Sequence, residues 1–337
     1  MSNKPKIGLL SPFHIPITAY EGPANDLDVD LVIVTPTRID WKDREVRGLV
    51  WAGKAWNEET VALPPVLYNR YYGPKPKVVD RLEIILGQNK VFNHITRFDK
   101  WGIHQLLAES TLKTHLPATC LYTPKRLGMY LERFKQVILK PVSGQLGTQI
   151  YLVMENRGGV QLHRGTKSPI AVFYSQEDLL EELESLVDEN FLVQQYIPFA
   201  SVDDRIFDIR FLLQKNGAGL WCVSGKLSRV ALRYSYITNL SHSIVRPEET
   251  LSQAYPNLDL LPTLTELSLE GARIVEASVG SLGELSVDFC LDHDGHIWII
   301  ELNAKPMKSM FGRLGDARLM QEIYQQPLLY ALHVASI

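Results

Sequence analysis

The sequence predicts a mixed α/β (α+β) protein made of several compact units, and three observations support this class. The chain has 337 residues, where a typical domain has about 150. Short apolar runs that end at turn residues recur along it, as buried strands do. Segments with helical spacing of apolar residues lie between these runs. We therefore expect three units, at residues 1–90, 91–200 and 201–337.

The first unit carries two strand signals. The apolar runs Ile7 to Leu10 and Leu31 to Val34 are each followed by Ser-Pro or Thr-Pro, which predicts buried strands closed by turns. A third strand-like run lies at 66–72 among prolines. From Lys90 to Glu109 the apolar spacing predicts linking helices, broken at Gly102.

The rest of the chain continues the mixed pattern. Residues 136–140 and 149–154 predict two strands of a hairpin around a glycine-containing loop. Ser175 resembles a helix N-cap, with Asp178 three residues further on. Further strands are expected at 191–197, 207–213, 220–224, 284–291 and 296–302.

Composition excludes several function classes. With 35 basic and 38 acidic residues the net charge is −3, which argues against a nucleic-acid-coating surface. No apolar run approaches the roughly 18 residues of a membrane span, and the first residues lack the apolar stretch of a signal peptide. Three cysteines without a Cys-x-x-Cys pair indicate neither disulfides nor structural zinc. We expect a cytoplasmic protein without nucleic-acid or membrane partners.

The sharpest motif is a hairpin pattern around Asp294-Gly295, a strong two-residue turn signal. Counting outwards from this turn pairs Cys290 with Ile299 and Asp288 with Glu301, and Asn303 follows on the same face as Glu301. Like charges placed opposite each other destabilise a sheet, and a bound cation would compensate for them. The all-oxygen set predicts Mg²⁺ or Mn²⁺. The alternative is a pair of solvent-facing carboxylates.

Two weaker motifs could bind phosphates. Lys140 ends an apolar strand beside a loop with Gly144 and Gly147, whose backbone N–H groups could approach an anion closely. A simple turn is the alternative. Asp208 and Arg210 share one face of a predicted strand, where Arg210 could clamp a phosphate or only neutralise its neighbour.

These pieces occur in the order of an ATP-grasp domain: Lys100, Lys140 with its glycine loop, the strand Gln194 to Ile197, Asp208-x-Arg210, Asp288 and Glu301-x-Asn303. In detail the chain resembles the endospore coat-associated YheC/YheD family through Tyr68-Asn-Arg70, Phe98-Asp-Lys-Trp101, Leu116-Pro-Ala-Thr119 and Glu301-Leu-Asn-Ala-Lys-Pro306. The resemblance implies an ATP-grasp fold, in which two α+β subdomains clasp ATP, preceded by a small α/β N-terminal domain.

The resemblance also implies a role for each matched residue. Lys100 and Lys140 would contact the phosphates of ATP, under a loop containing Ser143, Gly144 and Gly147. The strand Gln194, Gln195, Tyr196 and Ile197 would hold adenine, and Asp208 would lie near the ribose. Arg210, Arg229 and Asn239 would act at the reacting phosphate, and Asp288, Glu301 and Asn303 would hold Mg²⁺.

The implied activity is that of a carboxylate-amine ligase, which forms an acyl phosphate that an amine or similar nucleophile captures. Two other functions stay open. One is a spore-coat-associated structural protein that retains the fold without turnover, and the other is phosphoryl transfer to a small molecule. The sequence identifies neither the carboxylate nor the amine. A spore location and contacts with spore-coat proteins follow from the family name alone.

Overall fold

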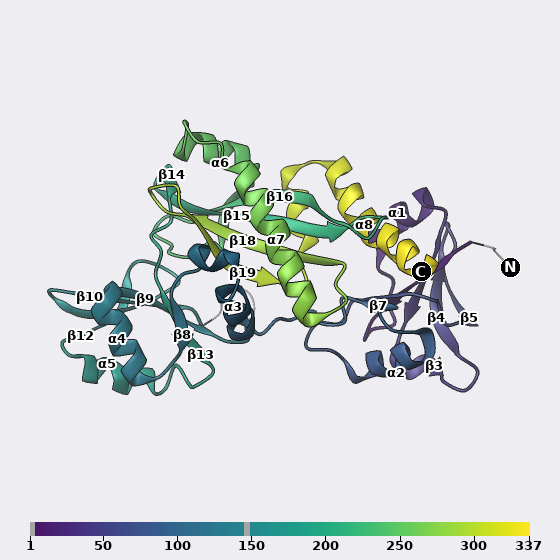
Figure 1. The fold of residues 1–337 in the computed structure, drawn as a ribbon, viewed down its shortest axis with the longest axis horizontal. Helices are drawn as coiled ribbons and strands as arrows, with labels where there is room; N and C mark the ends of the chain where they lie inside the picture. The colour runs from purple at the N-terminus through teal and green to yellow at the C-terminus, as the bar shows by residue number, and fades with distance from the viewer. Residues whose placement is uncertain (1–3, 145–148) are drawn as a thin grey trace.

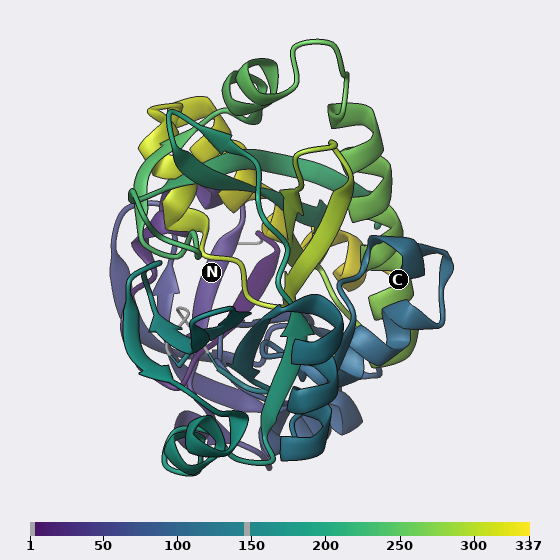
Figure 2. The same cartoon turned by 90° about the vertical axis from the view of Figure 1, so that its left-hand side faces the viewer.

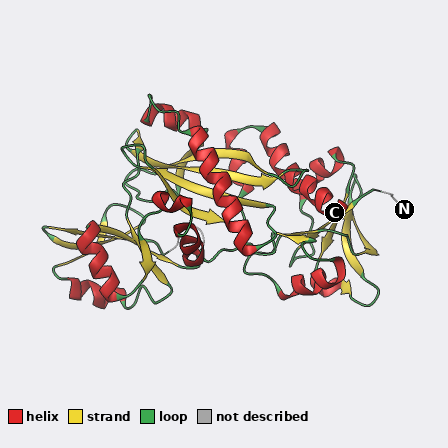
Figure 3. Cartoon of the chain, in the orientation of Figure 1, coloured by secondary structure: helices red, strands yellow, loops and turns green. Residues whose placement is uncertain are grey.

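Three β-sheets divide the protein into three structural units (Figure 1; Figure 3). The computed structural model describes residues 4–144 and 149–337. The first sheet is built from residues 6–92, the second from 119–195 and the third from 201–303. This confirms the mixed α/β class. The division at 1–90, 91–200 and 201–337 stays a proposal, because two helices pack on a unit distant from them in sequence, as described below.

The first sheet has the order β3-β4-β2-β1-β6-β7, with β5 paired to β4, and β2, β1, β6 and β7 run parallel. Its strands are Lys6–Leu10 (β1), Asp30–Val34 (β2), Ile39–Asp40 (β3), Glu45–Trp51 (β4), Trp56–Ala62 (β5), Leu67–Asn69 (β6) and Val91–Phe92 (β7). Its helices are Thr18–Tyr20 (η1), Glu21–Asp26 (α1), Pro36–Arg38 (η2) and Lys77–Leu86 (α2). The two apolar runs expected as strands are confirmed as β1 and β2. Both strands are buried, because parallel strands of this kind are covered on both faces of the sheet.

The linking helices expected over 90–109 are only partly correct. Residues 91–92 form β7, and a single helix, α3 (Lys100–Ala108), runs through Gly102 without a break. Its start is fixed by Asp99, whose carboxylate accepts hydrogen bonds from the N–H groups of Trp101 and Gly102. An N-cap aspartate outweighs the weak helix propensity of one glycine.

The second sheet is antiparallel, with the order β12-β11-β10-β9-β13-β8. Its strands are Thr119–Leu121 (β8), Gln136–Pro141 (β9), Tyr151–Asn156 (β10), Gly159–Arg164 (β11), Pro169–Phe173 (β12) and Phe191–Gln195 (β13). The expected β9–β10 hairpin is confirmed. Helices Pro124–Phe134 (α4) and Gln176–Leu183 (α5) pack on one face, and Ser175 caps α5 through the N–H of Asp178.

The third sheet has the order β17-β16-β15-β18-β19, with β14 paired to β15. Its strands are Ser201–Val202 (β14), Arg205–Lys215 (β15), Trp221–Ala231 (β16), Ser241–Val245 (β17), Glu284–Leu291 (β18) and Ile297–Asn303 (β19). Helices Pro247–Ala254 (α6) and Leu261–Val279 (α7) follow β17. The 3-10 helix Lys308–Leu314 (η4) and helix Ala317–Ser336 (α8) follow β19, and a further 3-10 helix, Thr111–His115 (η3), follows α3.

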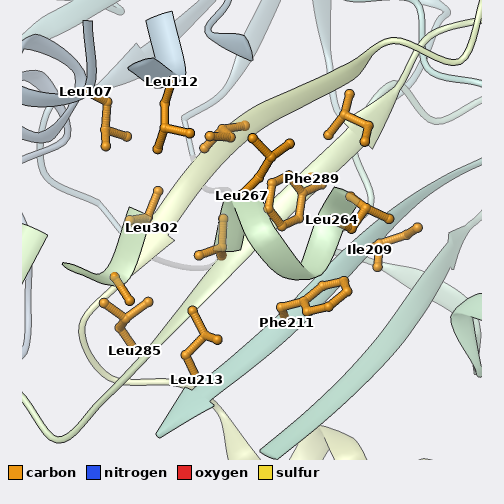
Figure 4. Packing of buried hydrophobic residues seen from close by; sticks show 14 of the residues in the cluster. Leu107, Leu112, Ile209, Phe211, Leu213, Leu264, Leu267, Leu285, Phe289 and Leu302 are labelled. Carbon is orange, nitrogen blue, oxygen red and sulfur yellow. The ribbon is translucent and has the colours of Figure 1, made fainter. Parts of the chain in front are cut away.

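Successive side chains of β15 point alternately to the core and to the polar face of this sheet. Phe207, Ile209 and Phe211 join the cluster that α7 and α3 cover, and Figure 4 shows Leu264 and Leu267 of α7 in one group with Phe211 and Phe289. Asp208 and Arg210 lie on the opposite face, as the period-two pattern predicts.

The C-terminal helix returns to the first unit. Leu328, Ala331 and Val334 of α8 pack with Ile7 and Leu9 of β1, and Figure 1 shows α8 reaching α1 at that end of the molecule. None of the helices within 4–144 and 149–337 combines the length and the apolar character needed to cross a membrane.

The predicted two-residue turn at Asp294-Gly295 is wrong in detail, although the Asp288–Glu301 pair is confirmed. The N–H of Asp292 donates to the carbonyl of His296, which leaves a three-residue loop with Gly295 at φ 81°, a common hairpin type. This loop shifts the register by one, so Cys290 faces Trp298 and not Ile299. An irregularity between Asp288 and Phe289 shifts it back.

We predict that Phe289→Ala destabilises the protein by about 3–5 kcal/mol, because it removes a fully buried ring from the core of the third sheet. Urea unfolding followed by near-UV circular dichroism measures this loss. Ile84→Ala, at a side chain that is 84% exposed, is the control and should change stability little. Equal stabilities of the two variants would contradict the packing described here.

Candidate active site

A cavity lies between the second and third sheets. Figure 1 and Figure 2 both place the second unit, in teal, below the green and yellow third unit. The cavity has a volume of about 230 Å³ and collects fourteen of the sixteen predicted site residues: Lys100, Lys140, Gly144, Gln194, Gln195, Tyr196, Ile197, Asp208, Arg210, Arg229, Asn239, Asp288, Glu301 and Asn303. Ser143 does not line it, and Gly147 lies outside the described residues.

Two aspartates and two arginines form the floor of this cavity. Arg210 makes a bidentate pair with Asp288, with Nε–Oδ1 2.7 Å and Nη2–Oδ2 2.6 Å. Arg229 donates to both carboxylate oxygens of Asp208, and its Nη2 is 2.9 Å from Oδ2 of Asp288. All four side chains are less than 10% exposed. Burial alone would raise the pKa of Asp288, but the two guanidiniums outweigh it and lower the pKa to about 2.

The loop before Asn239 contributes residues that sequence reasoning missed. The hydroxyl of Thr238 donates to Oδ2 of Asp208 at 2.5 Å. The hydroxyl of Tyr236 donates to the carbonyl of Ile150 at 2.8 Å, which joins the third unit to the second across the cavity. No motif marked either residue; their nearness to Asn239 was the one available signal.

Lys140 is a buried cation that forms no ion pair with any of the described residues. It is 7% exposed, and within the described chain no carboxylate lies within ion-pair distance of it, whereas Lys100 is 3.1 Å from Oε1 of Glu301. Burial lowers the pKa of Lys140 to about 8, with a smaller contribution from the neighbouring Lys100. An anion entering the cavity would supply the missing partner.

Apolar side chains surround the part of the cavity near Gln194 to Ile197. Gln194 is held by Thr119, to which its Nε2 donates at 2.9 Å, and burial raises the pKa of Tyr196 to about 12. Apolar side chains line the walls at Ile138, Ile150, Ile197, Phe199 and Ile300. A slot of this kind fits a flat aromatic base.

The predicted metal ligands lie together on β18 and β19. Asp288 faces Glu301, Ser286 faces Asn303, and Asp288, Glu301 and Asn303 all line the cavity. No group of three or more His, Cys, Asp or Glu side chains suited to a metal occurs in the described part of the chain, but this set contains only two carboxylates. Its oxygens suit Mg²⁺ completed by phosphates and water. Both oxygens of Asp288 bind arginine, whereas one oxygen of Glu301 contacts Lys100 and the amide of Asn303 has no hydrogen-bond partner among the described residues, so Glu301 and Asn303 are the more accessible donors.

A second lysine with a lowered pKa, Lys305, also lines the cavity. Lys305 donates to the carbonyls of Arg70 and Tyr71 at 2.7 and 3.3 Å. Burial, helped by Arg70, lowers the pKa of Lys305 to about 8. The cavity thus combines an apolar slot, a cluster of balanced charges and a basic region at Lys305.

Comparison with known proteins gives consistent matches. The sequence model described as YheC/D like ATP-grasp matches residues 88–334. The endospore coat-associated protein YheD of Bacillus subtilis is 26% identical over 298 residues, covering 81% of this chain and 64% of that protein. The chain therefore spans less than two thirds of YheD. The endospore coat-associated protein YheC of the same organism is 25% identical over 321 residues, covering 90% and 88%.

Solved structures share the fold. The ATP-grasp ligase PsnB, complexed with a phosphomimetic variant of its minimal precursor, Mg and ADP, aligns with a TM-score of 0.55 at 14% identity, covering 99% of each chain. D-alanyl-alanine synthetase A from Vibrio cholerae aligns with a TM-score of 0.54 at 14% identity over 100% of both chains. At these identities the similarity shows the fold, and it confirms the expected ATP-grasp architecture.

We predict that Arg229→Met destabilises the protein by about 3–5 kcal/mol, because it leaves two buried carboxylates with a single arginine. Urea unfolding measures the change. The exposed Arg233 provides the control, and Arg233→Met should have an effect below about 0.5 kcal/mol. A loss below about 1 kcal/mol in Arg229→Met would show that the cluster is not needed for stability.

Anion binding should weaken as pH rises through about 8. Lys140 loses its proton there in the free protein, and a bound phosphate raises its pKa, so binding takes up a proton. Isothermal titration with ADP from pH 7.5 to 9, in buffers of different ionisation enthalpy, measures this uptake.

The pH dependence of ADP binding should vanish in Lys140→Met. It should persist in Lys305→Met and in the exposed control Lys125→Met. If Lys305→Met removes the pH dependence instead, the anion binds beside Lys305.

Proposed function

The chain belongs to the YheC/D-like ATP-grasp family, and on this premise we propose that it is an ATP- and Mg²⁺-dependent ligase that activates a carboxylate for capture by an amine or similar nucleophile. The observation that carries the proposal is Lys140, a buried cation that has no carboxylate partner in the part of the chain that the structure describes, in a cavity whose acids are already paired. A polyphosphate would satisfy it. The apolar slot at Gln194 to Ile197 supports adenine as the attached base.

The proposed reaction has two steps. An oxygen of the substrate carboxylate attacks the γ-phosphorus of ATP, the bond to the bridging oxygen breaks, and ADP leaves. The amine then attacks the carbonyl carbon of the acyl phosphate, releases phosphate and gives up a proton. Negative charge gathers on the transferred phosphoryl group, so cations fixed beforehand around it lower the barrier.

The residues of this chain divide that work. Lys100 and Lys140 would hold the phosphates, and Arg210 and Arg229 would face the transferred group. Asn239, which also lines the cavity, would lie beside the reacting phosphate. When bound at Asp288, Glu301 and Asn303, Mg²⁺ would neutralise phosphate charge. The ion pairs with Asp208 and Asp288 hold the two guanidiniums in fixed positions.

The biological setting is a further part of the proposal. The two curated relatives are named endospore coat-associated, and from these names alone we extend the proposal to a role in spore formation with spore-coat contacts. The carboxylate and amine substrates are not identified by the family.

We predict that a non-hydrolysable ATP analogue binds the wild-type chain more tightly with Mg²⁺ than without it, and that Glu301→Gln removes most of this gain. A change in metal-site residues typically costs about 10–100-fold in metal affinity. Isothermal titration measures both constants. Glu301 is preferred to Asp288 because its side chain is 28% exposed and the substitution leaves the buried cluster intact.

Glu59→Gln, at an exposed strand position of the first unit, is the matched control and should bind as the wild type does. Absence of nucleotide binding by the folded wild type would refute the ligase and favour the structural alternative. Release of a stable phosphorylated product would identify a kinase.

A further inference from the structure

A second hollow continues the cavity outward. Asn239, Met307 and Met310 line both the cavity and this adjoining groove, which has a volume of about 480 Å³. Its other walls come from the start of β17 and from η4. The groove therefore begins where the ligase proposal places the reacting phosphate and leads away from it toward the surface.

The groove is apolar and carries one sign of charge. Leu240 and Met307 are 69% and 45% exposed and line the same groove, so they offer apolar surface to an occupant. Arg313 lines the groove without an ion-pair partner among the described residues, and no acidic residue lines it. An occupant with apolar side chains and an acidic group would match this lining.

The backbone beside the groove favours a peptide. β17 is the end strand of the third sheet and pairs only with β16 in the described chain, so one row of its N–H and C=O groups has no strand beside it. Ser241 at its start lines the groove. An extended peptide can add to such an edge through main-chain hydrogen bonds, while its alternate side chains enter an adjoining apolar groove.

We propose that this groove binds an extended, acidic peptide segment of the substrate and that the ligase acts on a carboxylate of that peptide. This rests on the proposed function, and it narrows the substrate class from any carboxylate to a peptide. Leu240 supplies apolar contact and Arg313 pairs with an acidic group of the peptide. Asn239, shared with the cavity, marks the point where the peptide carboxylate reaches the phosphate.

The test selects a displayed random octapeptide library on the full chain, with Mg²⁺ and a non-hydrolysable ATP analogue present. We expect the wild type to enrich peptides that alternate apolar residues and contain Asp or Glu. By fluorescence anisotropy, Leu240→Asp should bind the enriched peptides about tenfold more weakly, as loss of one buried leucine contact requires. Arg313→Glu should also weaken them, and more so at low salt.

Leu220→Asp is the matched control. Leu220 is also exposed, at 64%, and also directly precedes a strand, but it lies at the opposite end of β16 from the residues that pair with β17. This variant should bind the peptides as the wild type does.

Nucleotide titration on the same proteins separates the two proposals. A wild type that binds no nucleotide refutes the ligase itself. Nucleotide binding without peptide enrichment, or equal peptide binding by Leu240→Asp, overturns the groove proposal alone. ADP release driven by free amino acids and not by the enriched peptides would assign a small substrate and would also overturn it.

Discussion

The paired charges of Asp208, Arg210, Arg229 and Asp288 are the constraint on which the site depends. These residues lie on three neighbouring strands, and each carboxylate is in contact with at least one guanidinium. A buried charge without a partner is costly, so a slip of one strand by one residue, which would turn its side chains to the other face, would be strongly penalised. The register of β15, β16 and β18 thus fixes the cavity floor, while Phe207, Ile209 and Phe211 fill the core behind it.

The paired aspartates and arginines of the third sheet neutralise one another. The excess positive charge in the cavity therefore comes from the second unit and its neighbours. Lys140 projects from β9 into the same cavity and makes no ion pair with an acid within 4–144 and 149–337. Its burial is unfavourable in the free protein, and part of the binding energy of an anion comes from removing that penalty. The two sheets therefore have different tasks. One holds a rigid, neutralised surface and the other presents the cation that an anionic ligand would complete.

A second buried network connects the first unit to the third. Glu284 at the start of β18 is fully buried and contacts Lys308, Arg70 and Tyr68. Burial would raise the pKa of Glu284, but Lys308 and Arg70 outweigh it and lower the pKa. Because Lys305 binds the carbonyl of Arg70, this network also sets the basic region of the cavity. The first unit thereby shapes a site that the other two sheets enclose.

The sequence by itself determined the strand alternation, the hairpin that pairs Asp288 with Glu301, and the family to which the chain belongs, because these depend on local spacing and on an ordered set of motifs. It could not reveal that Arg210 and Arg229 are paired with Asp288, since the contacts join β15, β16 and β18, far apart in sequence. Local patterns also did not indicate Tyr236 and Thr238 as site residues. Nor did they predict the three-residue loop of the last hairpin and the irregularity after Asp288 that restores its register. The return of α8 to the first unit and the groove beside β17 belong to the tertiary structure alone, because they arise where surfaces from distant segments meet.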